Sequence, residues 1–383
     1  MDESNSLLKK ILGESRDEIE KQVKSSQVAY HQGAEGIDNL FELKDLEDIL
    51  EQPGIFENIR FNKDGKDINA YDTLNRQNNG HIHIPSFLLH INKGETCIVH
   101  KTEQRNKKLR QLCIELTHML KVPVSCNIYL TPAHQKAFPP HTDPHDVLIV
   151  QVAGKKLWHI EEDSKGLKKR ILKTGDILYI PRNTLHNAES YRSNVAYSMH
   201  LTFVIKKIYS EDLIAEYMST YAEESKGREI HLTHQSKDKE EVPEDIKRTM
   251  QTKSHFFNDI NYKNAKNKLI DKGIDESTYM FGGSIGSVLK LSEGSNSISR
   301  NTILKRTQNW YRTSGTKSKT LVHLKQYELS IPFEKYHVDR LLERDGKYQI
   351  KSLGNADEEA YMLIISEILV KRGILVICND QNS

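Results

Sequence analysis

The chain of 383 residues is nearly balanced in charge, with 55 basic and 53 acidic side chains and a net charge of +2. This length predicts two or three compact units, and the charge balance gives no electrostatic reason to expect nucleic acid as a partner. No stretch approaches the roughly 18 apolar residues of a membrane span, and the start lacks the pattern of a secretory signal. The four cysteines are widely spaced without a CxxC pair, which argues against a zinc ribbon or a disulfide framework. We therefore expect a cytoplasmic protein that does not enter a membrane.

Helical patterns flank a strand-rich middle of the chain. Apolar spacing predicts a loosely attached N-terminal helix within residues 5–30, an amphipathic helix over 38–51, and a helix over 107–120. Residues 210–268 are helical in pattern and highly charged, with an exposed linker over 237–244. Near the end, a capping box at 355–358 opens a helix that Gly373 stops, and a strand over 374–378 follows.

Short β-rich runs separated by turn residues begin after Val122. Strands of such length and spacing indicate a sandwich or barrel, which we expect to be the catalytic core. The predicted strands span residues 125–130, 147–152, 157–160, 177–180 and 195–205.

The most informative motif is His141-Thr142-Asp143, followed 45 residues after His141 by His186. The side chains of residues i and i+2 of a strand point to the same side, so His141 and Asp143 can bind one metal ion together. Two imidazoles and one carboxylate on one side of a metal leave positions open for other ligands, which is the arrangement typical of non-haem Fe(II) oxygenases. The alternative is a set of polar residues at a barrel rim.

Glycines and prolines frame both halves of this motif. Gly175, Pro181 and His186 follow the spacing of the second cupin motif, and Gly154 falls where the first cupin motif closes its hairpin. Asn183 stands where glycine is usual, and asparagine tolerates the left-handed conformation that a tight turn there needs. Two histidines compete for places in the triad: His200 for that of His186, and His145 for that of His141. Both fit the spacing less well.

Across this region the chain resembles the JmjC-type oxygenases, and within them the ribosomal oxygenase or cupin-like branch. The resemblance covers roughly residues 38–206, and it extends more weakly to the C-terminal helix and strand. It is carried by the segments 127–132, 141–147, 151–158, 175–181 and 198–202.

The resemblance implies a mixed α+β fold. Its core would be a double-stranded β-helix, the cupin or jelly-roll barrel, with flanking helices, a helical connector and a C-terminal winged-helix-like domain. The expected division is an N-terminal helical extension (1–37), a JmjC/cupin catalytic domain (38–206), a helical connector that serves dimerisation (207–310) and the winged-helix-like domain (311–383).

The resemblance also implies Fe(II), 2-oxoglutarate as cosubstrate and dioxygen. In the family a basic residue fifteen positions after the first histidine ligand pairs with the distal carboxylate of 2-oxoglutarate, and here that residue is Lys156. A buried ammonium needs such a partner, whereas the alternative for Lys156 is a surface hairpin lysine. Asn127 and Tyr129 match polar positions of the family pocket, with barrel packing as their alternative. Ser198 lies on the small and polar face of its strand, which we expect to line the pocket.

The function that follows is hydroxylation of an amino-acid side chain in a protein or peptide. Alternatives are hydroxylation of a small molecule or carrier-bound intermediate, demethylation of a methyl-lysine, and a non-catalytic cupin that only binds metal. The helical connector suggests a homodimer. We expect the C-terminal domain to have a structural role and not to bind nucleic acid, because its basic residues are offset by glutamates.

Overall fold

The structure is a computed structural model that describes part of the chain. It covers residues 7–378 except for 14–15, 35–36, 38, 76–78, 134, 136–137, 164–165, 192–195, 226–258, 277–286, 289–290, 292–297, 308–310, 317, 325–327, 345 and 354–355. The linker predicted at 237–244 and the start of the predicted capping box lie outside the described residues. Within the described residues, no helix is long and apolar enough to span a membrane.

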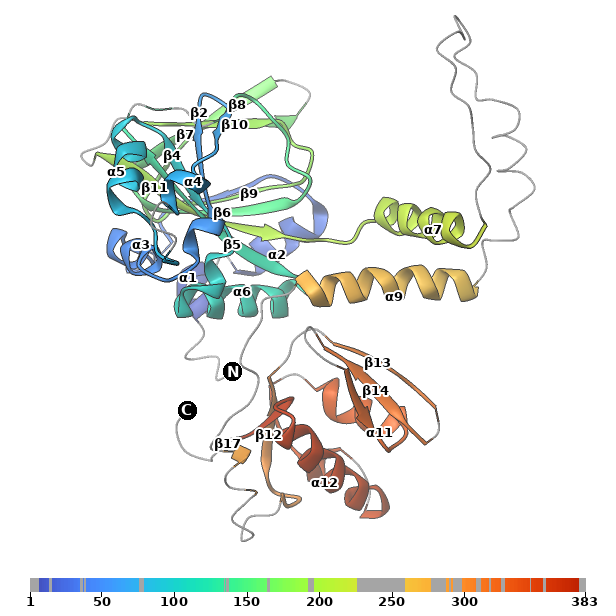
Figure 1. Ribbon diagram of the computed structural model, residues 1–383. Helices are drawn as coiled ribbons and strands as arrows, with labels where there is room; N and C mark the ends of the chain where they lie inside the picture. Colours follow the sequence, from blue (N-terminus) through green and yellow to red (C-terminus); the bar gives the residue numbers. More distant parts are fainter. Residues whose placement is uncertain are drawn as a thin grey trace, which may run out of the picture. The chain divides into compact units, whose positions relative to one another are not determined.

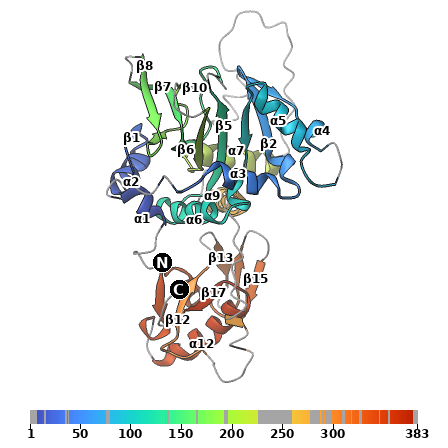
Figure 2. The same ribbon diagram turned by 90° about the vertical axis from the view of Figure 1, so that its left-hand side faces the viewer.

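Two antiparallel sheets make up the strand-rich part of the chain. The large sheet has eight strands in the order β1-β9-β6-β11-β5-β4-β2-β3, and the small sheet has three in the order β10-β7-β8. Figure 2 shows β8, β7 and β10 side by side. The strands are β1 (Ala29–His31), β2 (Ile59–Lys63), β3 (Lys66–Ile68), β4 (Thr96–Val99), β5 (Val124–Pro132), β6 (Asp146–Ala153), β7 (Lys155–Asp163), β8 (Gly166–Lys173), β9 (Ile177–Ile180), β10 (His186–Ser190) and β11 (Tyr197–Ile205).

The centre of the large sheet follows the alternation of the sequence. β11 pairs with β5 on one side and with β6 on the other, so that Leu201 lies opposite both Ile128 and Val150 in the core. The neighbouring residues Thr202 and Asn127 are paired on the other face of the sheet. Because successive side chains of a strand point to opposite faces, one face packs the core while the other is available to line a pocket. The five predicted strands are confirmed as β5, β6, β7, β9 and β11.

Of the described strands in these two sheets, six were not predicted, namely β1, β2, β3, β4, β8 and β10. β8 reads Gly-Leu-Lys-Lys-Arg-Ile-Leu-Lys and β10 reads His-Asn-Ala-Glu-Ser, so neither alternates between apolar and polar residues. Both become strands by pairing with β7. Tertiary pairing therefore overrides weak local propensity in these segments.

Helices cover the same part of the chain, as Figures 1 and 2 show for α6 below the large sheet. The predicted helix over 107–120 is confirmed as α6, and its N-cap Asn106 accepts hydrogen bonds from the backbone N–H groups of Lys108 and Leu109. The helix predicted over 38–51 is shorter, since it begins at Leu43. The helices here are α1 (Leu7–Leu12), α2 (Arg16–Ser25), α3 (Leu43–Leu50), α4 (Tyr71–Leu74), α5 (Ile84–Asn92) and α6 (Lys107–Leu120).

The expectation that the N-terminal helix is loosely attached was wrong. The segment forms two helices and a strand, and Ile19 and Val23 of α2 are buried in the main core. The backbone N–H of Leu8 donates to Glu115 Oε2 at 2.7 Å, and β1 pairs with β9. Buried apolar residues and a strand pairing together anchor this segment to the large sheet.

The remainder of the described chain contains two further parts. Residues 208–276 form a compact unit of their own, in which α7 (Ser210–Ser225) and α9 (Asp259–Glu276) run side by side (Figure 1). From Ile298 onward a separate apolar core joins two three-stranded sheets, β16-β12-β17 and β13-β14-β15. Its elements are β12 (Ile303–Arg306), β13 (Arg312–Gly315), β14 (Thr320–His323), β15 (Glu328–Ile331), α11 (Lys335–Leu342), β16 (Lys347–Gln349), α12 (Ala356–Lys371) and β17 (Leu375–Cys378).

Candidate metal centre and cosubstrate pocket

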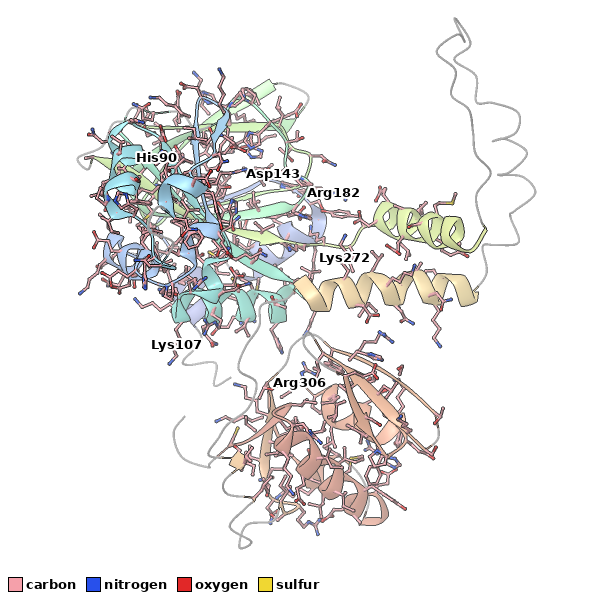
Figure 3. The ribbon with its side chains drawn as sticks, in the orientation of Figure 1. His90, Lys107, Asp143, Arg182, Lys272 and Arg306 are labelled. Atoms are coloured by element: carbon pink, nitrogen blue, oxygen red, sulfur yellow. The ribbon has the colours of Figure 1, made fainter. Side chains whose placement is uncertain are left out.

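Three potential metal ligands meet at the ends of β6 and β10. His186 is the first residue of β10, and it forms an isolated antiparallel bridge with His141, which precedes β6. The two backbones exchange both hydrogen bonds, His141 N to His186 O at 3.0 Å and His186 N to His141 O at 2.9 Å. Figure 3 marks Asp143 in this region, with Arg182 near it. The backbone thus places residues 45 positions apart directly opposite each other.

The side chains of these residues converge on one point. His186 Nε2 lies 3.5 Å from one carboxylate oxygen of Asp143, and His141 Nε2 lies 3.9 Å from the other. Among the described residues, His141, Asp143 and His186 are the one group of three whose ligand atoms all lie within 4.8 Å of one another. Two imidazole nitrogens and one carboxylate that converge in this way are the ligand set of a facial metal triad.

Both imidazoles are oriented by their second ring nitrogen. Nδ1 of His141 lies 3.0 Å from the carbonyl oxygen of Pro139, and Nδ1 of His186 lies 2.8 Å from that of Thr184. A carbonyl oxygen can only accept, so each Nδ1 carries the proton and each Nε2 presents a lone pair to the shared point. This tautomer is the one that a metal ion requires.

Asp143 is fixed by the turn that leads to His186. Its carbonyl oxygen accepts a hydrogen bond from Asn183 N at 2.9 Å, and Asn183 has a φ of +61°. The left-handed conformation expected at Asn183 is therefore present. Burial of Asp143 acts to raise its pKa, but the neighbouring imidazoles of His186, His141 and His145 together hold that pKa below its usual value. The carboxyl group is thus ionised and suited to bind a cation.

A tight hairpin brings a lysine from the small sheet into the space between the two sheets. Gly154 joins β6 to β7 with a φ of +67°, and a Cβ atom there would lie 2.2 Å from the carbonyl oxygen of Tyr197. Only glycine fits this close approach. Two residues further on, Lys156 is buried with 2% of its surface exposed, whereas Lys155 is exposed. Strand alternation thus directs Lys156 inward, and it is not a surface hairpin lysine.

The polar neighbours of Lys156 are neutral groups. Its Nζ donates to Thr131 Oγ1 of the large sheet at 3.1 Å and lies 3.5 Å from His200 Nδ1. Within the described part of the chain, no carboxylate forms an ion pair with Lys156. Burial lowers the pKa of Lys156 to about 7, and burial together with the Lys156 charge holds the pKa of His200 well below its usual value. The pocket therefore offers a cationic group that lacks a counterion.

Aromatic rings connect this lysine to the triad. The Trp158 ring centroid lies 6.1 Å from that of His186 and 5.7 Å from that of His200, and the indole Nε1 is buried without a hydrogen-bond partner in the described structure. Tyr129 stacks on His200 at 4.9 Å, and burial, followed by the charge of Asp143, raises the pKa of Tyr129 to about 12. Trp158 and Thr131 were not singled out from the sequence, although Trp158 follows Lys156 at the strand period of two.

The remaining candidate residues lie on β5 and β11 of the large sheet or in the segment that precedes β6. Asn127 Oδ1 accepts a hydrogen bond from the backbone of Lys101 at 3.2 Å. Ser198 is 1% exposed, and its Oγ accepts from Gln151 Nε2 at 2.9 Å. His200 lies beside Lys156. Neither His200 nor His145 belongs to the group of three converging ligands.

Comparison with known proteins identifies the same region. Residues 98–209 match the family model of the JmjC domain. The chain is 28% identical over 184 residues to the bifunctional lysine-specific demethylase and histidyl-hydroxylase NO66 of Drosophila persimilis, a match that covers 44% of the chain and 26% of that protein. It is 34% identical over 126 residues to ribosomal oxygenase 2 of Mus musculus, which covers 29% of the chain and 27% of that protein. The matches therefore span about a quarter of the length of these relatives.

Solved structures match over a larger share of the chain. The Escherichia coli ribosomal oxygenase YcfD aligns with a TM-score of 0.54 at 14% identity, covering 94% of this chain and 97% of that one. A YcfD structure in complex with cobalt and 2-oxoglutarate aligns with a TM-score of 0.53, also at 14% identity, and covers 94% and 98%. At this identity the likeness concerns the fold. Together with the match to the domain model, these similarities show that the chain is a mixed α+β protein with a JmjC/cupin fold, and that residues 98–209 form a JmjC domain.

Proposed function

We propose that this chain is an Fe(II)- and 2-oxoglutarate-dependent dioxygenase that hydroxylates an amino-acid side chain in a protein or peptide. His141, Asp143 and His186 hold the metal, and Lys156 binds the distal carboxylate of 2-oxoglutarate. The observation that carries the proposal is the buried Lys156 ammonium, which lacks a carboxylate partner among the described residues and is connected to His186 of the triad through His200 and Trp158. An uncompensated cation in a buried pocket is costly unless an anionic ligand occupies the pocket during function.

The donor set of the triad fits a first-row transition metal. Two neutral imidazoles with Nε2 available, together with an ionised carboxylate, form the ligand combination that non-haem iron enzymes use. The backbone bridge between His141 and His186 fixes their separation before any metal binds. This preorganisation supports metal binding as the role of the three residues.

The pocket also fits a dicarboxylate ligand. Lys156 provides a charge and Thr131 a hydroxyl group at one end, while the buried Trp158 Nε1–H is an additional donor between that end and His186. Buried polar groups without partners are rare in proteins and point to a ligand that satisfies them. Asn127, Tyr129 and Ser198 are proposed as further polar residues of this cosubstrate pocket.

The chain's own residues bind, orient and shield the reactants. Fe(II) with 2-oxoglutarate and dioxygen supplies, when bound, the oxidising power to insert a hydroxyl group into a C–H bond. The apolar faces of Trp158 and Tyr129 exclude water beside His186 and His200. The Nδ1–H groups of both imidazoles donate to backbone carbonyl oxygens, which orients each ring with Nε2 toward the metal. No side chain is required to act as a general acid or base.

The relatives favour a protein or peptide as substrate. The relatives include a lysine-specific demethylase and histidyl-hydroxylase and a ribosomal oxygenase, and these activities are named for amino-acid residues and for the ribosome. To identify the substrate, we suggest incubating the iron-loaded enzyme with a host lysate and searching by mass spectrometry for a gain of one oxygen atom, with Asp143→Ala as the control. Oxidation of a ribosomal protein supports the proposal, whereas oxidation of a metabolite supports the small-molecule alternative.

The enzyme class itself is tested without knowledge of the substrate. We expect slow conversion of 2-oxoglutarate to succinate that depends on Fe(II) and is abolished in Asp143→Ala. A purified iron-loaded protein that neither binds nor turns over 2-oxoglutarate contradicts the proposal and favours a non-catalytic cupin. Release of formaldehyde from a methyl-lysine peptide separates the demethylase alternative from hydroxylation.

Finer features of the architecture are proposed alongside the function. Lys156 on β7 of the small sheet contacts Thr131 on β5 of the large sheet, so the two sheets face each other at this point. This arrangement supports a double-stranded β-helix barrel. The pairing of β12 with β16 and β17, in one core with α11 and α12, supports a C-terminal winged-helix-like domain. We retain the division at 1–37, 38–206, 207–310 and 311–383 as a proposal to be tested by limited proteolysis.

A homodimer is proposed through the helical connector. Large apolar side chains are exposed on α7 and α9, namely Ile214, Met218 and Tyr262. Exposed apolar residues gathered on helices are typical of interaction surfaces. Light scattering of the full chain tests this proposal, and replacement of Ile214 by aspartate should produce a monomer. Cytoplasmic location and the lack of nucleic-acid binding stay predictions, which imaging of the tagged protein and a DNA-binding assay test.

A further inference from the structure

The two imidazoles of the triad are supported to very different degrees. The side chain of His186 is 5% exposed, belongs to β10, and packs near Trp158. The side chain of His141 is 36% exposed. Its backbone belongs to none of the named strands and is paired through an isolated bridge to His186. Because a metal ligand must be held within a fraction of an ångström, His141 requires support from another part of the fold.

That support comes from the hairpin formed by β2 and β3. The segment before His141 lies against it: the Phe138 ring centroid is 5.4 Å from that of His141, and the guanidinium carbon of Arg60 on β2 lies 5.6 Å from the Phe138 centroid. Pro139, the next residue, provides the carbonyl oxygen that accepts from His141 Nδ1. Both neighbours of the ligand are therefore positioned by contacts that begin on the hairpin.

Polar contacts inside the hairpin fix Arg60 relative to the turn. Asn62, which is fully buried, donates from Nδ2 to Asp67 Oδ1 at 2.8 Å and accepts from Gly65 N at 3.1 Å. The other oxygen of Asp67 lies 3.3 Å from Arg60 Nη1. The network links the turn residue Gly65 to the cation over Phe138, so the hairpin behaves as one rigid element.

The turn itself makes a close contact with the segment that leads to His141. Gly65 has a φ of +80°, and a Cβ atom on it would lie 2.4 Å from Pro139 Cδ and 3.0 Å from Pro139 Cγ. A proline ring is bonded to its own backbone nitrogen and cannot rotate away, so any side chain at position 65 must move the Pro139 backbone. The carbonyl that orients His141 would move with it.

We propose that the β2–β3 hairpin positions His141 for metal binding, with Arg60 acting through Phe138 and Gly65 acting through Pro139. Both are positioning residues and do not touch the metal. This inference rests on the proposed metal site and extends it to residues that lie 76 to 81 positions before the ligand in sequence. Loss of a partner that orients a metal ligand typically weakens metal affinity by about 10- to 100-fold.

The test compares two glycine substitutions in the metal-free, full-length protein. Gly65→Ala drives a methyl group into Pro139, whereas Gly346→Ala introduces the same strain at a φ of +78° with nothing within 4 Å. We expect calorimetry to show that Co(II) binding weakens about tenfold in Gly65→Ala and stays unchanged in Gly346→Ala. The visible absorption spectrum of the Co(II)-saturated protein should change in Gly65→Ala alone, because that spectrum reports ligand geometry.

A second variant covers the case in which Gly65→Ala fails to fold. Arg60→Met removes the charge above Phe138 and retains much of the apolar side chain, and we expect it to weaken Co(II) binding severalfold while the melting temperature of the metal-free protein stays close to that of the wild type. Asp143→Ala serves as the control and should bind no Co(II). With that control in place, the inference would be overturned if Arg60→Met binds Co(II) with the affinity and absorption spectrum of the wild type, and if Gly65→Ala, when it folds, does the same. A wild-type chain that fails to bind Co(II) would instead overturn the proposed metal site.

Discussion

If Lys156 binds 2-oxoglutarate as proposed, the affinity for this cosubstrate should depend on pH by an amount that follows from the pKa of Lys156. In the ligand-free pocket, burial lowers the pKa of Lys156 to about 7. A bound carboxylate stabilises the ammonium form and raises that pKa again. Binding therefore takes up a proton whenever the pH exceeds about 7, and the affinity must fall as the pH rises.

The size of this effect follows from the fraction of charged lysine. With a pKa of about 7, the charged fraction of Lys156 decreases from about one half at pH 7 to about 3% at pH 8.5. If only the charged form binds, the apparent dissociation constant rises roughly 16-fold over this interval. His200 does not contribute, because its pKa is well below the usual value and the ring stays neutral throughout.

Isothermal titration with 2-oxoglutarate in the presence of saturating Mn(II) measures this dependence, and Lys156→Arg provides the matched control. A guanidinium group stays charged throughout this pH range, so the arginine variant should lose the dependence even if its affinity is lower. An equal decrease in affinity for the wild type and Lys156→Arg would show that another group titrates. A wild-type affinity that does not change with pH would refute the assignment of Lys156 as the anchor.

Three further substitutions test individual contacts. Gly154→Ala places a Cβ atom 2.2 Å from the Tyr197 carbonyl oxygen at a positive φ, and urea unfolding should show a loss of stability of about 3 kcal/mol or more. Lys207→Met removes a partner located 2.6 Å from the fully buried Asp146 carboxylate, and the free energy of unfolding should fall by about 3 kcal/mol; a loss below about 1 kcal/mol would contradict this reasoning. Trp158→Phe removes the unpaired indole N–H, so the ligand-free protein should gain up to about 1 kcal/mol while 2-oxoglutarate binding weakens severalfold, both measurable by thermal shift.

The metal motif could be predicted from the sequence because its geometry is largely local. The i, i+2 spacing of His141 and Asp143 and the turn residues before His186 constrain the backbone, and Asn183 adopts the left-handed conformation that its residue type allows. Inward orientation of Lys156 followed from the period of two along β7. Trp158 lies two residues after Lys156 and faces the same side of β7, but it is uncharged. From the sequence alone, an aromatic residue on a strand is predicted to belong to the hydrophobic core.

Long-range pairing was the part that the sequence could not supply. β8 and β10 have no alternating pattern and became strands through β7, and the N-terminal helices joined the main core through contacts such as Leu8 with Glu115. The hairpin from Arg60 to Asp67 gives no sequence signal that relates it to His141, since the connection consists of van der Waals and ring contacts across about 80 positions.

The sequence by itself indicated which side chains are suited to bind a metal and a dicarboxylate, because this chemistry depends on residue type and short spacing. Tertiary structure decided how these groups are supported: which carbonyl orients each imidazole, that Lys156 has neutral neighbours, and that the β2–β3 hairpin lies against the segment before His141. The physical reason is that ligand chemistry is a property of single side chains, whereas burial and positioning arise from packing between segments distant in the chain.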